Sequence, residues 1–224
     1  LEELKSKPFT NFIHPDDIEL TQHEIKEQTS GGETANFINR YYHKNGSLRY
    51  LEWNALPSEK GYLYASAMDV TEQIHKEEKL EKSEEKYRLL FNYSNDAIVV
   101  HEIREDKLPG RIIEVNKQAC RLLQYSREEL LQMSIRNITP EKNHSLMPSR
   151  ARKLIEEKHL TFEAEEVRSD GVIIPVEVSA YSYNEDGKEF VLSSVRDISE
   201  RKILEKELKS NTEFMENILD NMHD

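Results

Sequence analysis

The residues of this sequence that could carry out chemistry are few and widely spaced. Cys120 is the single cysteine, so the chain forms no internal disulfide, and a lone thiol fits a reducing compartment. The eight histidines show no metal-ligand spacing, no nucleophile is paired with a recognisable base, and no glycine-rich nucleotide-binding loop occurs. We therefore expect neither a catalytic centre nor a metal site, which leaves binding and signalling as the function classes to consider.

Two acidic motifs have the D-x-x-E spacing of a helix N-cap with a capping box: "DVTE" at 69–72 and "DISE" at 197–200. Each predicts a strand that ends where a charged helix begins. Because the junction occurs twice, we interpret it as a mechanical connector; the alternative is a well-capped helix with no signalling role. The junction residues are Asp69, Thr71, Glu72, Asp197, Ser199 and Glu200.

The junctions belong to a longer internal repeat. Pro15 aligns with Pro140 and Gly46 with Gly171 at an offset of 125 residues, and from Asp69 onward the offset is 128. We therefore divide the chain into the second half of one repeat, a helical linker, a full repeat, a second linker and the start of a third repeat. The predicted bounds are 1–73, 74–90, 91–200, 201–218 and 219–224.

Composition excludes several function classes. The net charge of −12 argues against a nucleic-acid partner, because a phosphate-binding surface needs clustered lysine and arginine. No apolar run approaches the roughly 20 residues of a membrane span, and the first residues lack the apolar centre of a signal peptide. We expect a cytoplasmic segment without membrane contact, whose parent protein is free to be anchored elsewhere.

The full repeat predicts two strands, then helices, then three strands. Short β-rich runs at 96–103 and 110–116 flank a Pro-Gly pair that suggests a hairpin. Helices follow with Asn116 and Ser126 as N-caps, and a further helix is expected to start near Pro148. The last three strands meet at Asp-Gly turns at 170–171 and 186–187. This order indicates an α+β domain with an antiparallel sheet and helices on one face.

Three motifs in this repeat resemble the PAS domain, a sensory module of signalling proteins. They are "EVNKQACRLLQYSREEL" at 114–130, "DG" with "PVEVSA" at 170–180, and the closing "RDISER" at 196–201. The resemblance implies a PAS fold with a five-stranded antiparallel sheet, helices on one face and long connecting helices. Tandem copies with charged linkers look most like the input region of a multi-PAS sensor histidine kinase, although diguanylate cyclases and other outputs use similar arrays.

The resemblance places a sensing pocket between the sheet and the helices. Strand and helix periodicity assigns apolar, mostly small or branched residues to its walls. These residues form either a pocket for a small-molecule ligand or a filled core that binds no ligand. The pocket candidates are Ile98, Val100, Ala119, Leu123, Ile138, Leu154, Ile155, Val176, Val178 and Ala180.

The linkers have apolar residues at spacings of three and four, the pattern of a coiled-coil seam. A parallel homodimer through the linker helices and PAS domains is the expected assembly, with a polar residue in each seam fixing the register. The alternative is that each helix packs on its own domain. The predicted seam residues are Leu80, Tyr87, Leu90, Leu204, Leu208, Asn211, Met215 and Ile218.

Light-sensing relatives use a flavin and a cysteine, but Cys120 lies earlier in the chain than that cysteine and is expected to be a buried core residue. Haem-binding relatives use a histidine on the long helix, which makes His144, at its start, and His159, at its end, the residues to check. His223 in "FMENILDNMHD" resembles a phosphoacceptor box, but its spacing favours the start of a third repeat. The sequence does not identify a cofactor, and the absence of one is the favoured interpretation.

Together these features predict a sensory segment that passes a ligand or redox signal through helical linkers to an output domain outside the chain. The parent protein is expected to be a histidine kinase of a two-component system. A haem- or flavin-binding redox or light sensor and a ligand-free dimerisation and spacing scaffold remain as alternatives.

Overall fold

The computed structural model describes residues 6–29, 34–58 and 62–221. The chain divides into two compact units, of which the first ends at Lys86 and the second begins at Tyr87. Each unit has its own antiparallel sheet. Among the described residues, no helix is long and apolar enough to cross a membrane.

Five antiparallel strands form the sheet of the second unit, in the order β5-β4-β8-β7-β6. The predicted turn between β7 and β8 is confirmed: Asp186 and Gly187 have φ values of 49° and 82°, as a tight hairpin turn requires. The strands are β4 Ala97–Ile103, β5 Pro109–Val115, β6 His159–Val167, β7 Ile173–Glu185 and β8 Lys188–Asp197.

The first hairpin differs from the prediction at its turn. The chain reverses between Arg104 and Leu108, whose backbone N–H and C=O groups bond at 2.9 Å, so the Pro-Gly pair lies inside β5. Gly110 is needed there for a different reason. A Cβ on this residue would lie 2.7 Å from Cγ of Glu102, which is closer than non-bonded carbon atoms approach.

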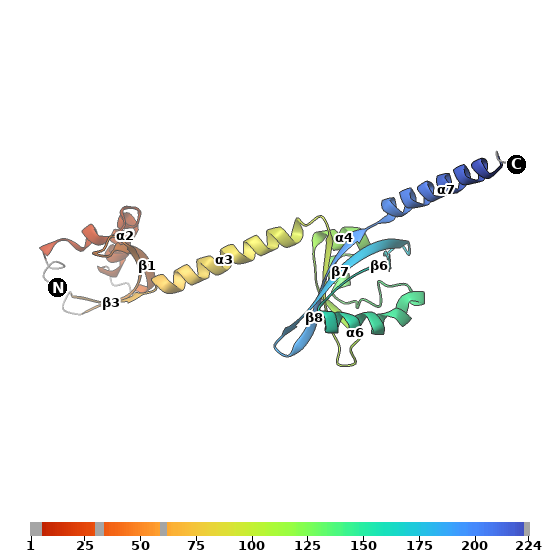
Figure 1. Cartoon of the computed structure of the whole chain (residues 1–224). Helices are drawn as coiled ribbons and strands as arrows, with labels where there is room; N and C mark the ends of the chain where they lie inside the picture. The colour runs from red at the N-terminus through yellow and green to blue at the C-terminus, as the bar shows by residue number, and fades with distance from the viewer. Residues whose placement is uncertain (1–5, 30–33, 59–61, 222–224) are drawn as a thin grey trace. The chain divides into compact units, whose positions relative to one another are not determined.

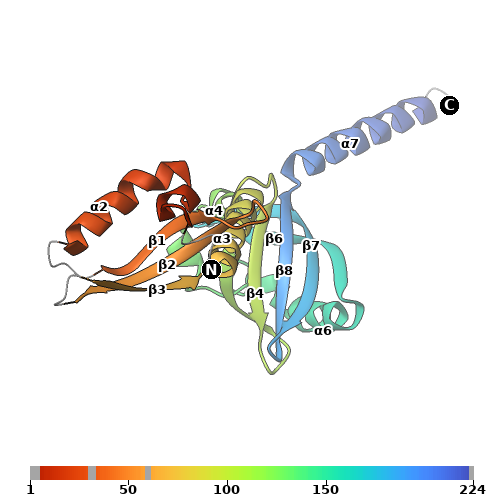
Figure 2. The same cartoon turned by 90° about the vertical axis from the view of Figure 1, so that its left-hand side faces the viewer.

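Helices pack on one face of this sheet (Figure 2). The predicted N-caps are confirmed: Asn116 accepts the N–H of Ala119 at 2.8 Å, and Ser126 forms a complete capping box with Glu129. Pro148 lies in the first turn of its helix, where proline is tolerated. These elements are α4 Lys117–Leu123, α5 Arg127–Leu130, the 3-10 helix η3 Glu141–Leu146 and α6 Met147–Glu157.

The hydrophobic core of the second unit lies between the sheet and these helices. It includes the fully buried Ile112, Leu123 and Ile138. Asn116 is also fully buried, and its amide donates to the backbone oxygens of Phe91 and Asp96 at 2.9 and 3.0 Å. The predicted α+β class with an antiparallel sheet and helices on one face is therefore confirmed.

The first unit has a three-stranded sheet in the order β1-β2-β3. β1 and β2 begin 125 residues before β6 and β7 (159 − 34 and 173 − 48), and β3 ends 128 residues before β8 (197 − 69). The sequence repeat is therefore a repeat of strands in the same register. Its elements are η1 Phe9–Phe12, η2 Pro15–Asp17, α2 Ile18–Thr29, β1 Thr34–Tyr42, β2 Leu48–Pro57 and β3 Leu63–Asp69.

A long helix follows the last strand of each sheet. α3 spans Thr71–Asn92 and contains residues 74–90, and α7 spans Ser199–Asn221 and contains residues 201–218. α7 leads away from the end of β8 (Figure 1). Residues 222–224, which include His223, lie outside the described residues, so the structure does not test the assignment of His223.

Candidate functional site

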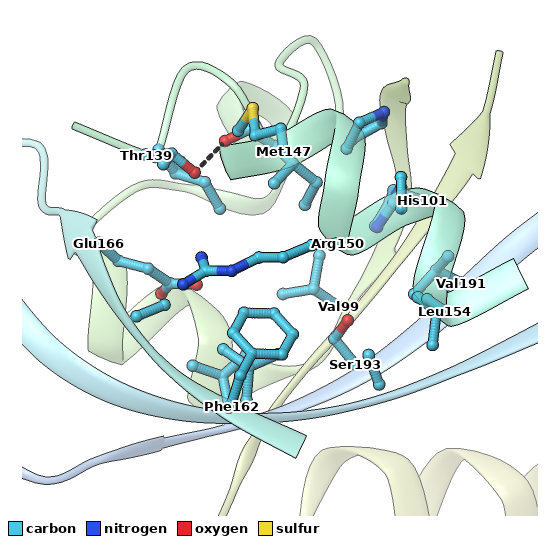
Figure 3. Close-up of a pocket in the computed structure, with 18 of the residues that line it drawn as sticks. Val99, His101, Thr139, Met147, Arg150, Leu154, Phe162, Glu166, Val191 and Ser193 are labelled. Carbon is cyan, nitrogen blue, oxygen red and sulfur yellow. Dashed lines mark hydrogen bonds between the residues drawn. The ribbon is translucent and has the colours of Figure 1, made fainter. Parts of the chain in front are cut away.

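A cavity of about 100 Å³ lies between α6 and strands β4, β6, β7 and β8 of the second unit (Figure 3). Its walls are mainly apolar and include Val99, Phe162, Val191 and Val195. Since α6 covers the helix-facing side of the sheet, strands and helix each contribute one wall. Such a concave, apolar space with a few polar groups is the usual form of a ligand site.

Four of the predicted pocket residues line this cavity: Ile138, Leu154, Val178 and Ala180. Three others, Ala119, Leu123 and Val176, are buried in the surrounding core but lie outside the cavity lining. The structure therefore brings the helical and sheet residues together as a core with a small space at one end.

The predicted orientation of β4 is wrong by one residue. Val99, His101 and Ile103 line the cavity, whereas Ile98 and Val100 do not. β4 is a central strand, and Val100 is only 5% exposed, so both faces are covered and alternation cannot tell them apart.

The helix assignment also needs one correction. Ile155 lies about 100° around α6 from Leu154 and lines a shallow hollow with Pro148 and Arg152 on another side of the helix. Ile155 is therefore outside the cavity.

Glu166 is one of several polar cavity residues that the sequence analysis missed, together with Arg150 and His101. It is 9% exposed, its Oε2 has no hydrogen-bond partner, and burial raises the pKa of its carboxyl to about 8. The carboxyl is therefore mostly protonated at neutral pH. A signal was present in the sequence, because Phe162, Ala164 and Glu166 share one strand face at a period of two.

Arg150 enters the cavity from α6. Its guanidinium carbon lies 4.4 Å from the centre of the Phe162 ring, and Nη2 donates to the backbone oxygen of Glu163 at 3.2 Å. Burial lowers the pKa of Arg150, which still leaves a guanidinium charged in the physiological range. Figure 3 shows the side chains of Arg150 and Glu166 reaching toward each other above Phe162.

His101 is the histidine that lines the cavity. It is 6% exposed, and its Nδ1 donates to the backbone oxygen of Glu102 at 2.9 Å. Burial lowers its pKa, so the ring is neutral and Nε2 is left as a hydrogen-bond acceptor.

The three residues weighed for cofactor chemistry lie elsewhere. Cys120 is half-buried in the core, and burial raises the pKa of its thiol. His144 lies in η3 and bonds through Nε2 to the backbone oxygen of Thr139 at 2.9 Å. His159 begins β6 rather than ending the helix, because α6 stops at Glu157; its ring stacks on Tyr181 at 4.2 Å.

The cavity is thus separate from the three residues that were considered for binding a cofactor. None of Cys120, His144 and His159 lines the cavity. Within residues 6–29, 34–58 and 62–221, no group of three or more histidine, cysteine, aspartate or glutamate side chains could hold a metal ion.

The predicted capping boxes are wrong, although both aspartates cap a helix. Asp69 accepts the backbone N–H of Thr71 at 3.0 Å, and Asp197 accepts that of Ser199 at 2.8 Å. Both are Asx-type bonds to the second residue along the chain. Glu72 pairs with Lys76 instead, at 2.7 Å, rather than reaching back to the strand.

A buried residue between strand and helix explains the difference. Val70 and Ile198 are 7% and 3% exposed, and their N–H groups bond to the backbone oxygens of Tyr50 and Pro175 at 2.9 and 3.1 Å. These bonds continue each sheet one residue further than predicted, so the helices begin at Thr71 and Ser199.

The first turn of α7 is anchored to the outer face of its own sheet. Arg201 pairs with Glu163 at 2.8 Å and with Glu177 at 3.3 Å, and Lys202 pairs with Glu163 at 2.6 Å. Lys202 and, to a lesser extent, Arg201 lower the pKa of Glu163. Since Glu163 lies between Phe162 and Ala164 on β6, one strand carries both a cavity wall and the helix anchor.

The first turn of α3 is held differently. Gln73 and Ile74 occupy the positions of Arg201 and Lys202 at the offset of 128. Tyr50 of β2 contacts this end of α3 twice: its N–H donates to Oγ1 of Thr71 at 2.9 Å, and its ring packs edge-on against His75 with ring centres 5.8 Å apart.

The predicted seam residues are mostly exposed on the long helices. Tyr87 is half-exposed, and its hydroxyl bonds to Glu114 of β5 at 3.1 Å, so this residue contacts its own domain. The side chain of Ile218 lies outside the described residues. The exposed members are Leu80, Leu90, Leu204, Leu208, Asn211 and Met215.

The first unit also contains a hollow of about 280 Å³, which is lined mainly by residues of α2 and of the three-stranded sheet. Asn39 lies in it and is 2% exposed. The indole N–H of Trp53 donates to Oδ1 of Asn39 at 2.8 Å, and Nδ2 of Asn39 donates to Oγ1 of Thr21 at 2.9 Å. The buried amide of Asn39 is therefore hydrogen-bonded within the protein.

Comparison with known proteins identifies both units. A family described as "PAS domain" matches residues 95–200, and one described as "PAS fold" matches residues 1–64. The methyl sulfide methyltransferase-associated sensor of Methanosarcina acetivorans is 30% identical over 190 residues, which are 84% of this chain and 18% of that protein. The chain thus spans less than a fifth of this relative's length.

Solved structures that resemble part of this chain include PAS domains of other proteins. The PAS domain of an HTR-like protein from Haloarcula marismortui is 28% identical with a TM-score of 0.49, and covers 55% of this chain and 98% of its own. A PAS domain from a two-component sensor histidine kinase is 23% identical with a TM-score of 0.45, and covers 52% of this chain and 97% of its own. With the family matches over residues 1–64 and 95–200 and the fold described above, the chain belongs to the PAS domain family and is a PAS sensory region.

Proposed function

We propose that the PAS domain of the second unit receives a small-molecule signal in its cavity and passes it to α7. The observation that carries this proposal is the double role of β6. Phe162 and Ala164 line the cavity on one face, and Glu163 between them binds Arg201 and Lys202 of α7 on the other. A ligand that displaces the inner residues moves the anchor, because neighbouring residues share one backbone.

Transmission of this kind needs two arrangements of the junction. The ligand shifts their populations only as far as it binds one arrangement more tightly than the other. The anchor suits such a switch, because its ion pairs are solvent-exposed and individually weak. A strong buried contact would hold α7 in one position regardless of the ligand.

We also propose that α7 continues the signal as a homodimer. Leu204 and Leu208 are 58% and 70% exposed, which leaves an apolar stripe on α7 available for a second copy of the chain. Asn211 lies on the same stripe, and a paired asparagine in a parallel coiled coil fixes the register. The exposure of these residues supports this assembly over packing of α7 on its own domain.

The wider context of the proposal is the cytoplasmic input region of a two-component sensor histidine kinase. It is supported by two PAS units in one chain, each followed by a long helix, and by a relative whose name describes a sensor. The kinase domain would lie outside this sequence.

The test is a phase experiment on the full-length protein that contains this chain. One residue inserted after Ser210 rotates the following helix by about 100° and should change the output strongly, whereas seven residues restore the stripe and should be tolerated better. A one-residue insertion at the exposed Asp186-Gly187 turn is the matched control. If the insertion of one residue after Ser210 leaves output unchanged, transmission through a rigid α7 is wrong.

A further inference from the structure

The unpartnered carboxyl oxygen of Glu166 calls for a ligand. Buried polar atoms are almost always hydrogen-bonded, because leaving one unpaired costs about 1–3 kcal/mol. Three such side-chain atoms occur in the described part of the chain, on Glu166, Arg168 and Glu189. Of these residues, Glu166 lines the cavity, so a cavity ligand can reach its free oxygen.

The charge of the cavity indicates the sign of that ligand. The titratable groups that face it are His101 from β4, Arg150 from α6, and Glu165 and Glu166 from β6. His101 is neutral and Glu166 is mostly protonated at neutral pH, because burial disfavours both charges. Glu165 is neutralised by Lys142 at 2.7 Å. Arg150 therefore leaves the site with a net positive charge.

Arg150 also has donors to spare. Its described contacts are one bond from Nη2 to a backbone oxygen and the packing on Phe162, and it forms no ion pair within the described residues. A guanidinium presents several N–H groups in a planar fork that matches a carboxylate. The protonated carboxyl of Glu166 adds one further O–H donor.

The remaining walls set the size and polarity of the rest of the ligand. Val99, Leu154, Val191 and Val195 form an apolar end to a cavity of about 100 Å³. An engineered cavity of about 150 Å³ holds the six carbon atoms of benzene, so this smaller one suits about four or five non-hydrogen atoms. An alkyl chain of one or two carbons therefore fits beside a carboxylate group.

We propose that the cavity binds a short-chain aliphatic monocarboxylate, with its carboxylate between Arg150 and Glu166 and its alkyl chain against Val99 and Val191. This assignment rests on the proposed sensory function and adds the chemical class of the signal. The carboxylate accepts from the Arg150 guanidinium and from the Glu166 O–H, which satisfies the free oxygen of Glu166 as a donor.

The first experiment measures binding of three probes with the same three-carbon skeleton, propionate, propionamide and propylamine, to the full 224-residue chain at pH 7 by calorimetry. Propionate should bind about tenfold or more tightly than propionamide, since a bond to a charged group contributes about 1.5–3 kcal/mol. Propylamine should bind more weakly than both. Equal binding of propionate and propionamide, or preferred binding of propylamine, would overturn the carboxylate assignment.

A pH series on the unaltered protein tests the role of Glu166 without any substitution. Propionate affinity should fall about tenfold between pH 7 and pH 9, because ionisation of a carboxyl with a pKa of about 8 replaces a donor by a like charge. Glu166→Gln keeps a neutral donor and should bind propionate similarly at both pH values. A pH-independent affinity in the unaltered chain contradicts the assigned role.

The second pair of variants tests Arg150. Arg150→Met should lower propionate affinity by about tenfold or more and leave propionamide binding nearly unchanged. Arg152→Gln removes an exposed arginine from the same helix and should change neither. A loss of the same size in both variants would mean that the general charge of α6, rather than Arg150 in the cavity, attracts the anion.

The ligand class and the proposed transmission fail in different ways. If propionate binds as described but does not alter hydrogen exchange at the first turn of α7, transmission is wrong and the ligand class stands. If the phase experiment at Ser210 succeeds while propionate does not bind, the ligand class is wrong and transmission stands.

Discussion

The two PAS units place their buried polar groups at different positions of the same framework. In the first unit, Asn39 accepts from Trp53 and donates to Thr21, so the buried amide is satisfied within the protein. At the offset of 125, these three positions hold Ala164, Val178 and Leu146, all apolar.

The second unit places polar groups at two other positions of the same framework. Glu166 and Arg150 occupy the positions of Tyr41 and Ile25 (166 − 41 and 150 − 25 are both 125). Neither is satisfied by the other in the described structure. One fold therefore holds a hydrogen-bonded polar network in one copy and unpaired hydrogen-bonding groups in the other, which supports the proposal that the second copy binds the ligand.

The junctions differ in the same sense. Thr71 accepts the N–H of Tyr50 at 2.9 Å, which ties the start of α3 into its sheet. Pro175 is the counterpart of Tyr50 and has no N–H, so Ser199 cannot be held in this way. The start of α7 instead depends on exposed ion pairs, whose strength changes easily with position and salt.

The largest effect is expected from removing Asn39 from its hydrogen bonds with Trp53 and Thr21. Asn39→Leu leaves the Trp53 indole N–H without its acceptor in a partly buried site and should destabilise the first unit by about 1–3 kcal/mol. Trp53 is the single tryptophan, so its fluorescence during urea unfolding reports this unit. Gln22→Leu on the exposed side of α2 is the control. An unchanged midpoint in Asn39→Leu would show that the network contributes nothing.

The next largest effect is expected from replacing the buried carboxyl of Glu166 in the second unit. The folded pKa of Glu166 is about 8, above its ordinary value of 4.5, so the folded state holds more protons between these values. Stability from this group therefore falls as pH rises from about 4.5 to 8. Glu166→Gln should remove that slope and stabilise the unit by about 1–3 kcal/mol at pH 8.

Urea unfolding followed by circular dichroism at pH 5 and pH 8 measures this difference. The exposed substitution Glu128→Gln is the control and should leave the slope as it is. A Glu166→Gln variant that is equally stable at pH 8, or less stable there, is the result that contradicts a buried, unsatisfied carboxyl.

A smaller effect is expected at the cap of α3. Asp69→Ala removes the acceptor for Thr71 and should cost about 1 kcal/mol, whereas Asp69→Asn keeps the acceptor and should cost less. The bond to Thr71 lowers the pKa of Asp69, so its contribution is present above the ordinary pKa and is lost as pH falls through the lowered one. Thermal unfolding at pH 7 and pH 3 checks the size and the sign, and equal stability of Asp69→Ala and Asp69→Asn at pH 7 would exclude this cap.

The smallest effect concerns the anchor of α7. Arg201→Gln combined with Lys202→Gln should raise hydrogen exchange in the first turn of α7 by roughly twofold to fivefold, since exposed ion pairs contribute little. Sodium chloride at high concentration should have a similar effect on the unaltered chain, and the first turn of α3 should change little in either case. Equal changes at both helices would remove the contrast between the junctions.

The sequence by itself determined the repeat, the α+β class and two of the helix caps. Pro15, Gly46 and Asp69 recur at offsets that the strands follow, and the caps at Asn116 and Ser126 lie where they were expected. These features depend on residues close together in the chain, or on the covalent order of the strands. They can therefore be predicted from the sequence without knowledge of the tertiary structure.

Only the tertiary structure decided the orientation of β4, the length of each final strand and the members of the polar site. β4 is covered on both faces, and Val70 and Ile198 bond to distant strand residues. Arg150 packs on Phe162, which lies 12 residues further along the chain (162 − 150). Each of these outcomes depends on which surfaces meet after folding. Periodicity within a single element carries no information about such contacts, because they form between elements whose separation in sequence is set by loops and turns.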